Sequence, residues 1–358
     1  MIKTLLLITS LTFSIAVSAA DIYGVSDRDL QTILKRHGKE IAEFEAAIEK
    51  GVKNISTDET ANRTASPLDL DIKKRKRELV DKLIKEYGFL FIDVQIILYP
   101  DTNKLYTTIE IVDKDHPERL RFISPKQSHI DPEKKSAHAP DLIEAMIRYD
   151  NITLELLRTN QLVSTSTCPV YHCTSGFDSP ELKPWLAMFN EGAVKEKTLI
   201  LNTLKHDPNP ERRAAAAFLV GHFQDPHEIL SVLLPQVTDK DEDVRNNVMR
   251  VMGTTMMKAK ISDINIEPIL ALLDSPSTTD RNKALIILLT AVESDAVKKQ
   301  ILQKGTNNLL AILRLEQPNN HDWAYHILKK ISGKDFGETN LDAWRKWYSV
   351  TKKTNFIT

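Results

Sequence analysis

The segment at residues 241–253 reads DEDVRNNVMRVMG, and two other segments share its plan. They are NPERRAAAAFLVG at residues 209–221 and TTDRNKALIIL at residues 278–288. Each begins with acidic or polar residues and continues with apolar residues that cover one side of a helix, which predicts an amphipathic helix. Arg213, Arg245 and Arg281 occupy equivalent places in the three copies, 32 and 36 residues apart.

A second apolar helix is expected after each copy, at residues 228–237, 266–273 and 296–312. A repeat of this length with two helices per unit predicts a helical solenoid. A last unit at residues 322–333 keeps the apolar pattern but has Trp323 near the place of the arginine. We therefore expect about four to five units between residues 183 and 358.

The Asp/Glu-x-x-Arg-x-x-Ala pattern that opens the first helices resembles HEAT-like repeats, over roughly half of the chain. This resemblance implies a structural ladder of charges between neighbouring units, formed by Arg213, Asp243, Arg245, Asp280 and Arg281. The helix dipole also favours acidic groups at the start of a helix. The family implies a scaffold and no single reaction.

The end of the chain resembles the closing segment of many bacterial HEAT-repeat proteins. It contains Trp344 and Trp347, and this spacing places both rings on one face of a helix. An open solenoid end exposes the apolar face of its last unit. We expect the two rings to cover that face as a C-terminal cap.

Residues 21–165 are expected to form a small α+β unit. The spacing of apolar residues predicts helices at 30–50, with Gly51 as the stop, at 70–87 and at 142–157. Alternating, β-branched runs predict a β-hairpin with strands at 89–99 and 105–112, and a third strand is expected at 119–123. The predicted fold class is therefore mainly α: a C-terminal HEAT-like α-solenoid preceded by a small α+β unit with a β-hairpin.

The second of these helices carries consecutive basic residues, Lys73, Lys74, Arg75, Lys76 and Arg77. The simplest interpretation is a solvated helix face, with the apolar residues of the same helix turned inward. The alternative is contact with an anionic lipid or polysaccharide.

The first 20 residues have the parts of a secretory signal peptide. Lys3 supplies the positive start, residues 5–17 are largely apolar, and the segment from Val17 to Ala20 offers small residues for cleavage. The apolar part is shorter than the ~20 residues of a membrane-spanning helix. We expect cleavage after Ala19 or Ala20, and a mature protein that is periplasmic or secreted and has no transmembrane helix.

The chain has two cysteines, Cys168 and Cys173. A close pair in an exported protein is typical of a small disulfide loop. A zinc or redox site that also uses His172 is the alternative. However, zinc needs further ligands at a recognisable spacing, and a redox dithiol normally has a shorter spacer. We expect a structural disulfide, in a junction at residues 166–182.

Composition and motifs exclude several function classes. The chain has 48 basic and 49 acidic residues and a net charge of −1, without the basic excess of a nucleic-acid binder. It has only 11 glycines in 358 residues, few for a Rossmann or P-loop enzyme. It contains no His-Glu-x-x-His, no Gly-x-Ser-x-Gly and no EF-hand loop. We expect no enzymatic activity, no cofactor and no metal.

The leading hypothesis is an exported, non-enzymatic scaffold whose second helices present a concave face to another protein or an extended peptide. One alternative is an envelope-surface protein that contacts anionic lipid or polysaccharide through its basic helix. Another is an enzyme with a motif-less site between the two halves. Asn54, Asn62 and Asn151 lie in glycosylation sequons, which matter only in a host that glycosylates secreted proteins.

Overall fold

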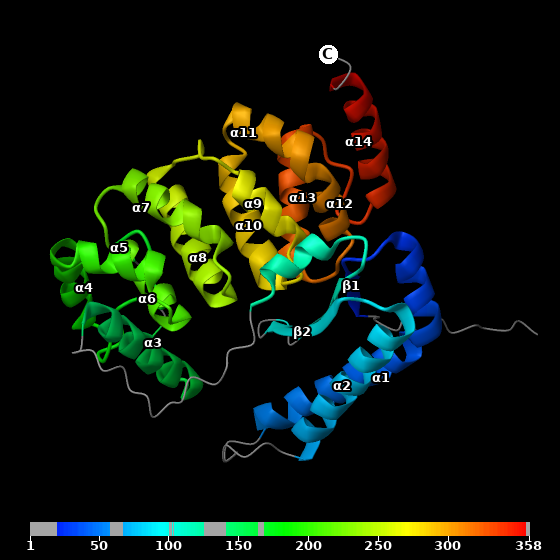
Figure 1. Ribbon diagram of the computed structural model, residues 1–358, viewed down its shortest axis with the longest axis horizontal. Coiled ribbons are helices and arrows are strands. Elements are labelled where there is room, and N and C mark those ends of the chain that lie inside the picture. Colours follow the sequence, from blue (N-terminus) through cyan, green and yellow to red (C-terminus); the bar gives the residue numbers. More distant parts are fainter. Residues whose placement is uncertain are drawn as a thin grey trace, which may run out of the picture.

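The computed structural model describes residues 20–57, 67–99, 102, 104–124, 141–163 and 168–355 (Figure 1). Residues 1–19 of the expected signal peptide and the sequon asparagine Asn62 lie outside these residues, and Asn151 is exposed on a helix. No helix in the described part of the chain is long and apolar enough to cross a membrane.

The N-terminal unit, blue to cyan in Figure 1, is a small sheet with two helices on one face. Its elements are β1 (Asp21–Tyr23), α1 (Asp27–Thr57), α2 (Pro67–Tyr87), β2 (Phe91–Tyr99), β3 (Lys104–Val112) and the 3-10 helix η1 (Pro117–Phe122). The strand order is β1-β3-β2. β1 runs parallel to β3 with Asp21 opposite Thr108, and β2 runs antiparallel to β3 with Phe91 opposite Val112.

Alternation along these strands gives the sheet two different faces. One face carries Ile22, Ile92, Val94, Ile109 and Ile111, which form a core with α1 and α2. The opposite face carries Tyr23, Gln95 and Glu110, which contact the helical array. The sheet is therefore buried between its own helices and the array.

The predicted hairpin is confirmed, but two local predictions are wrong. Residues 119–123 do not form a third strand, because Pro117 begins the 3-10 helix η1 there. The third strand is β1, at the start of the described chain. Gly51 does not end the first helix, which continues to Thr57.

The second part of the chain is an array of helices, green to red in Figure 1, and the predicted fold class is confirmed. Three helices open it: α3 (Leu142–Arg158), α4 (Trp185–Lys195) and α5 (Lys197–His206). The first helices of the repeat units are α6 (Pro210–Val220), α8 (Glu242–Ala259), α10 (Thr278–Ala291) and α13 (Pro318–Ser332). Neighbouring first helices pack against each other along the array.

The second helices are shorter and end in tighter turns. They are α7 (Pro226–Leu233) with η2 (Leu234–Thr238), α9 (Glu267–Ala271) with η3 (Leu272–Asp274), and α11 (Asp295–Gln300) with the π-helical turn η4 (Ile301–Gly305) and α12 (Thr306–Leu313). The closing helix α14 (Leu341–Asn355) packs against α12.

Side-chain caps explain where the first helices begin. Asn209 Oδ1 accepts from the N–H of Glu211, Asp241 Oδ1 from the N–H of Asp243, and Ser277 Oγ from the N–H of Asp280. Each satisfies a backbone donor that the first turn of a helix leaves free.

The helix α3 belongs to the core of the array, although we expected it in the N-terminal unit. Ile143, Met146 and Tyr149 are buried in one cluster with residues of α6, among them Phe218. Packing therefore places the boundary between the N-terminal unit and the array before α3 rather than near residue 165.

Candidate functional site

The repeat arginines are held at the turns that precede the first helices. Arg213 pairs with Asp239 at 2.8 Å, in the turn before α8. Arg245 pairs with Asp280 at 2.7 Å, on the next first helix. These two pairs connect neighbouring units.

Arg281 breaks this pattern, because its carboxylate partner comes from the N-terminal sheet. Its guanidinium donates to both oxygens of Glu110 on β3, at 2.8 and 2.5 Å. It also donates to Asn320 of the following unit at 2.9 Å and lies 4.0 Å from the centre of the Tyr23 ring. Arg281 and Glu110 are both fully buried.

The expectation that Asp243 belongs to the ladder is not met by the geometry. Asp243 lies exposed in the first turn of α8, and no ion pair involves it among the described residues. The acidic residues that pair with Arg213 and Arg245 are Asp239 and Asp280.

Four successive turns of the array, which we call the turn edge, are covered by residues that precede them in the chain: α3 covers the first turn, and the N-terminal unit covers the other three. Arg212, after the first of these turns, pairs with Asp141 and Glu144 at the start of α3. At the second turn, Arg245 donates to the carbonyl of Phe122 in η1 at 2.8 Å, and the N–H of Glu242 donates to Ser124.

The sheet covers the third and fourth turns. At the third, Tyr23 donates to the carbonyl of Leu273 at 2.7 Å, and Gln95 accepts from Thr278. At the fourth, the Asp21 carboxylate accepts from the N–H groups of Glu316 and Gln317 at 2.8 to 3.0 Å. The turn edge is thus occupied by the chain itself.

The two predicted cap residues differ in burial. Trp344 is fully buried, donates from Nε1 to the carbonyl of Gly337 at 2.8 Å, and packs edge-to-face against Phe336. Trp347 is half-buried and lies edge-to-face against Trp344, with the ring centres 5.9 Å apart. Both belong to α14, which covers the last repeat helices.

The basic run on α2 is mostly paired with acidic side chains. Arg75 pairs with Asp71 at 2.7 Å. Lys76 pairs with Asp93 at 2.7 Å and also donates to the carbonyl of Val94 on β2. Lys74 lies 3.9 Å from a Glu78 oxygen. Lys73 and Arg77 are exposed, and neither forms an ion pair within the described ranges.

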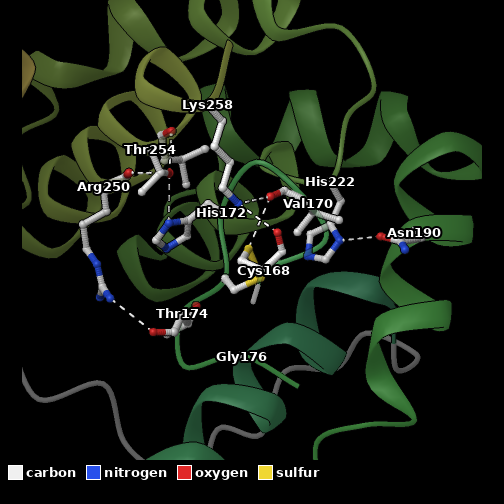
Figure 2. The surroundings of a disulfide bond; sticks show 12 residues. Cys168, Val170, His172, Thr174, Gly176, Asn190, His222, Arg250, Thr254 and Lys258 are labelled. Atoms are coloured by element: carbon white, nitrogen blue, oxygen red, sulfur yellow. Dashed lines mark hydrogen bonds between the residues drawn. A yellow bond between two sulfur atoms is a disulfide. The ribbon is translucent and has the colours of Figure 1, made fainter. Parts of the chain in front are cut away.

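The two cysteines form a disulfide within a segment that we call the strap, Cys168–Gly176 (Figure 2). The strap crosses the ends of α6 and α8. The N–H of Tyr171 donates to the carbonyl of Gly221 at 3.1 Å, and Lys258 donates to the carbonyl of Cys168 at 3.1 Å. Tyr149 of α3 donates to the carbonyl of Gly176 at 2.5 Å.

Several titratable groups lie in the strap or next to it, among them His172 and His222 (Figure 2). His172 stacks on Phe218, and burial together with the nearby Arg250 lowers its pKa to about 3. Burial lowers the pKa of His222 to about 4, and its Nδ1 lies 2.8 Å from Asn190 Oδ1. Both imidazoles are therefore neutral at pH 7. Burial raises the pKa of Asp150 on α3 to about 7.

A surface pocket of about 500 Å³ lies beside the strap, and we call it the strap pocket. Its lining mixes apolar and polar groups: Cys168, Pro169, Val170, Tyr171, Asn190, His222, Phe223, Gln224 and Lys258. His222 to Gln224 belong to the turn before α7, the first of the second helices. The pocket therefore lies on the edge of the array opposite the turn edge.

A second pocket, of about 340 Å³, lies between the hairpin and α13. Tyr99, Tyr106, Trp323 and Asp322 are among its lining residues. Within the described part of the chain, no group of three or more His, Cys, Asp or Glu side chains could hold a metal ion.

Sequence reasoning missed the strap pocket except for its cysteines. Asn190, Lys258 and the turn that holds His222 and Gln224 come from separate parts of the array, and no local pattern connects them. It also missed Glu110, which is simply an acidic residue in an alternating strand until the sheet docks against Arg281.

Comparison with known families agrees with this architecture. Residues 198–290 match the family described as HEAT repeats. These residues span α5 to α10, including the units of Arg213, Arg245 and Arg281. No curated protein and no solved structure matches the chain. HEAT repeats support a helical-repeat scaffold and commonly mediate protein interactions.

Proposed function

We propose that this protein is an exported, non-enzymatic scaffold that binds a polypeptide segment of a partner along its second helices, beginning at the strap pocket. One observation carries the proposal: the chain occupies its own turn edge at four successive turns, which leaves the opposite edge and the second helices for a partner.

The accessible surface suits an extended peptide. His227 and Ser231 on α7 are exposed, and the strap pocket at the start of this helix offers the apolar Val170 and Phe223 beside Lys258. Lys304 and Asn307 extend the exposed second-helix surface toward the other end. A platform that is already rigid loses little conformational entropy when it binds a flexible segment.

Two further observations bear on compartment and partner. A disulfide-bonded pair is typical of oxidising compartments, which supports export. The pairing of Arg75 and Lys76 with acidic side chains reduces the free positive charge of α2, which favours a protein partner over an anionic surface.

The test is site-specific photocrosslinking in the producing cell. A photoreactive residue at Ser231 of α7 should trap a discrete adduct, whereas one at the exposed Lys39 of α1 should not. Filling the strap pocket with Gln224→Trp should abolish the Ser231 adduct.

Gln303→Trp is the matched control, because Gln303 is also exposed but lies in the π-helical turn η4 at the far end of the array. The proposal fails if Gln224→Trp leaves the adduct unchanged, or if Lys39 traps the same adduct. Circular dichroism melts of both tryptophan variants confirm that the fold is retained.

A further inference from the structure

The start of β1 is buried against α1. Ala20 is only 6% exposed and belongs to the core between the sheet and the two N-terminal helices. The Ala20 backbone N–H lies near enough to the carboxylate of Glu45 on α1 to lower the pKa of that carboxyl, an effect smaller than that of burial. The Ala20 nitrogen and the Glu45 carboxylate are therefore direct neighbours.

The Glu45 carboxylate has no positive partner among the described residues. Its Oε2 is buried and makes no hydrogen bond within the described structure. The groups that face it are the hydroxyl of Thr107 on β3 and the carboxylates of Glu49 on α1 and Asp21 on β1. Burial, the largest effect, raises the pKa of Glu45 to about 7. A buried carboxylate without a cation destabilises a fold.

The sequence can supply a cation at this place through one cleavage. Val17 and Ala19 are small residues three and one positions before Ala20, as a signal peptidase requires. Hydrolysis would break the bond between the Ala19 carbonyl carbon and the Ala20 nitrogen. Water supplies a hydroxyl to Ala19 and a proton to that nitrogen, which then takes up a second proton as an α-ammonium.

Cleavage one residue later would not place an ammonium group beside the Glu45 carboxylate. It would remove Ala20 and place the ammonium on Asp21, the residue whose backbone pairs with Thr108 at the start of the parallel ladder. The core position of Ala20 would then be empty.

We propose that the chain is processed between Ala19 and Ala20, and that Glu45 binds the α-ammonium of the mature N-terminus. This inference rests on the export proposed above. Processing then stabilises the fold: the precursor carries an uncompensated carboxylate, and the mature chain carries an ion pair.

The pH dependence follows from the raised carboxyl pKa of the unprocessed chain. A carboxyl whose folded pKa exceeds its unfolded value contributes stability below pH ~4.5, and this contribution is lost as pH rises through about 7. In the processed chain, the α-ammonium of Ala20 would pair with the ionised Glu45 carboxylate, so this stability would not be lost as the pH rises. The mature chain should therefore keep its stability between pH 6 and 8 better than a chain with an extension.

The test compares recombinant chains with defined first residues, made by a scarless fusion protease. A chain that begins at Ala20 should melt roughly 3 °C higher at pH 7.5 than one that begins at Ala19, which has the same charge one residue away. Glu45→Gln should abolish the difference. Glu43→Gln, an exposed residue of the same helix, should leave it unchanged.

A second measurement does not depend on melting. The α-amine of ¹⁵N-labelled Ala20 should titrate above the usual range of about 7.7–8.0, and Glu45→Gln should return it to that range. Equal melting temperatures together with an ordinary amine pKa would overturn the role of Glu45.

N-terminal sequencing of the exported protein tests the site itself. A first residue of Ala20 supports the proposal, and Asp21 overturns it. A chain that keeps Met1 would refute export, while the two recombinant chains still decide whether Glu45 binds an ammonium.

Discussion

A single buried ion pair shows how one residue connects the two parts of this molecule. Arg281 uses its guanidinium on Glu110 of the sheet, on Asn320 of the next unit and on the carbonyl of Ser275. A buried charge is tolerated only when its hydrogen-bonding capacity is met, and here it is met by groups from distant parts of the sequence. Loss of either partner leaves the other charge uncompensated.

Glu110→Gln should therefore destabilise the protein by about 3–5 kcal/mol, because it removes one charge of a buried pair. Urea unfolding measures the change. Glu118→Gln, on the exposed side of η1, is the control and should change stability little. A loss equal to that of the control would show that the pair does not hold the sheet to the array.

The buried histidines predict a loss of stability in acid. The pKa values of His172 and His222 are lowered by burial to about 3 and 4, whereas an unfolded histidine takes up a proton near pH 6.5. Their contribution is complete above pH 6.5 and is lost as the pH falls toward 4. Melting temperatures between pH 7 and 4 should fall less steeply in His222→Gln than in the natural protein. The exposed His227→Gln should not change the slope.

The strap is an element that its disulfide closes into a small loop. Thiol labelling of the unreduced, denatured protein should find no free sulfhydryl on Cys168 or Cys173. Replacing both with serine should cost about 2 kcal/mol, from the entropy of the opened loop. Amide exchange should become faster at Tyr171, whose N–H contacts Gly221. Labelling of both thiols, or stoichiometric zinc, would contradict the structural disulfide.

The buried Trp344 anchors the closing helix α14 to the array. Trp344→Ala should cost about 3–5 kcal/mol, because the buried ring leaves a cavity and an unpaired Gly337 carbonyl. Trp347→Ala should cost less, since that ring is half-buried. Hydrogen exchange should quicken in residues 322–352 more than in residues 209–220, since coupling in a solenoid runs between neighbours. Unchanged protection would mean that α14 is not a cap.

At the scale of the whole molecule, the N-terminal unit and the array behave as one body. The sheet contributes partners to the third and fourth turns, and η1 contributes partners to the second. Removing residues 20–124 would expose the turn edge, including the fully buried Arg281.

We therefore expect thermal unfolding in a single transition. Calorimetry and circular dichroism should report the same midpoint for the full chain. A chain that begins at Asp141 should melt earlier or aggregate. Two separate transitions in the full chain would show that the sheet and the array fold independently.

Features that depend on local spacing could be predicted from the order of the residues. The helical period and the recurrence of Arg213, Arg245 and Arg281 predicted the solenoid, because each unit must bury one apolar face against its neighbours. The alternating runs predicted the hairpin, because side chains of a strand alternate between two faces. These patterns lie within about 40 residues of chain.

Contacts between groups that are distant in the sequence depend on how the whole chain packs. Glu110 is far from Arg281 in the sequence. The same is true of Ala20 and Glu45, and of Lys258 and the strap. The same reason explains the wrong third strand and the placement of α3, since both depend on which surface offers burial. A buried charge loses its hydration and needs a partner that offsets this loss. Packing of the whole chain supplies that partner, which need not be near in the sequence.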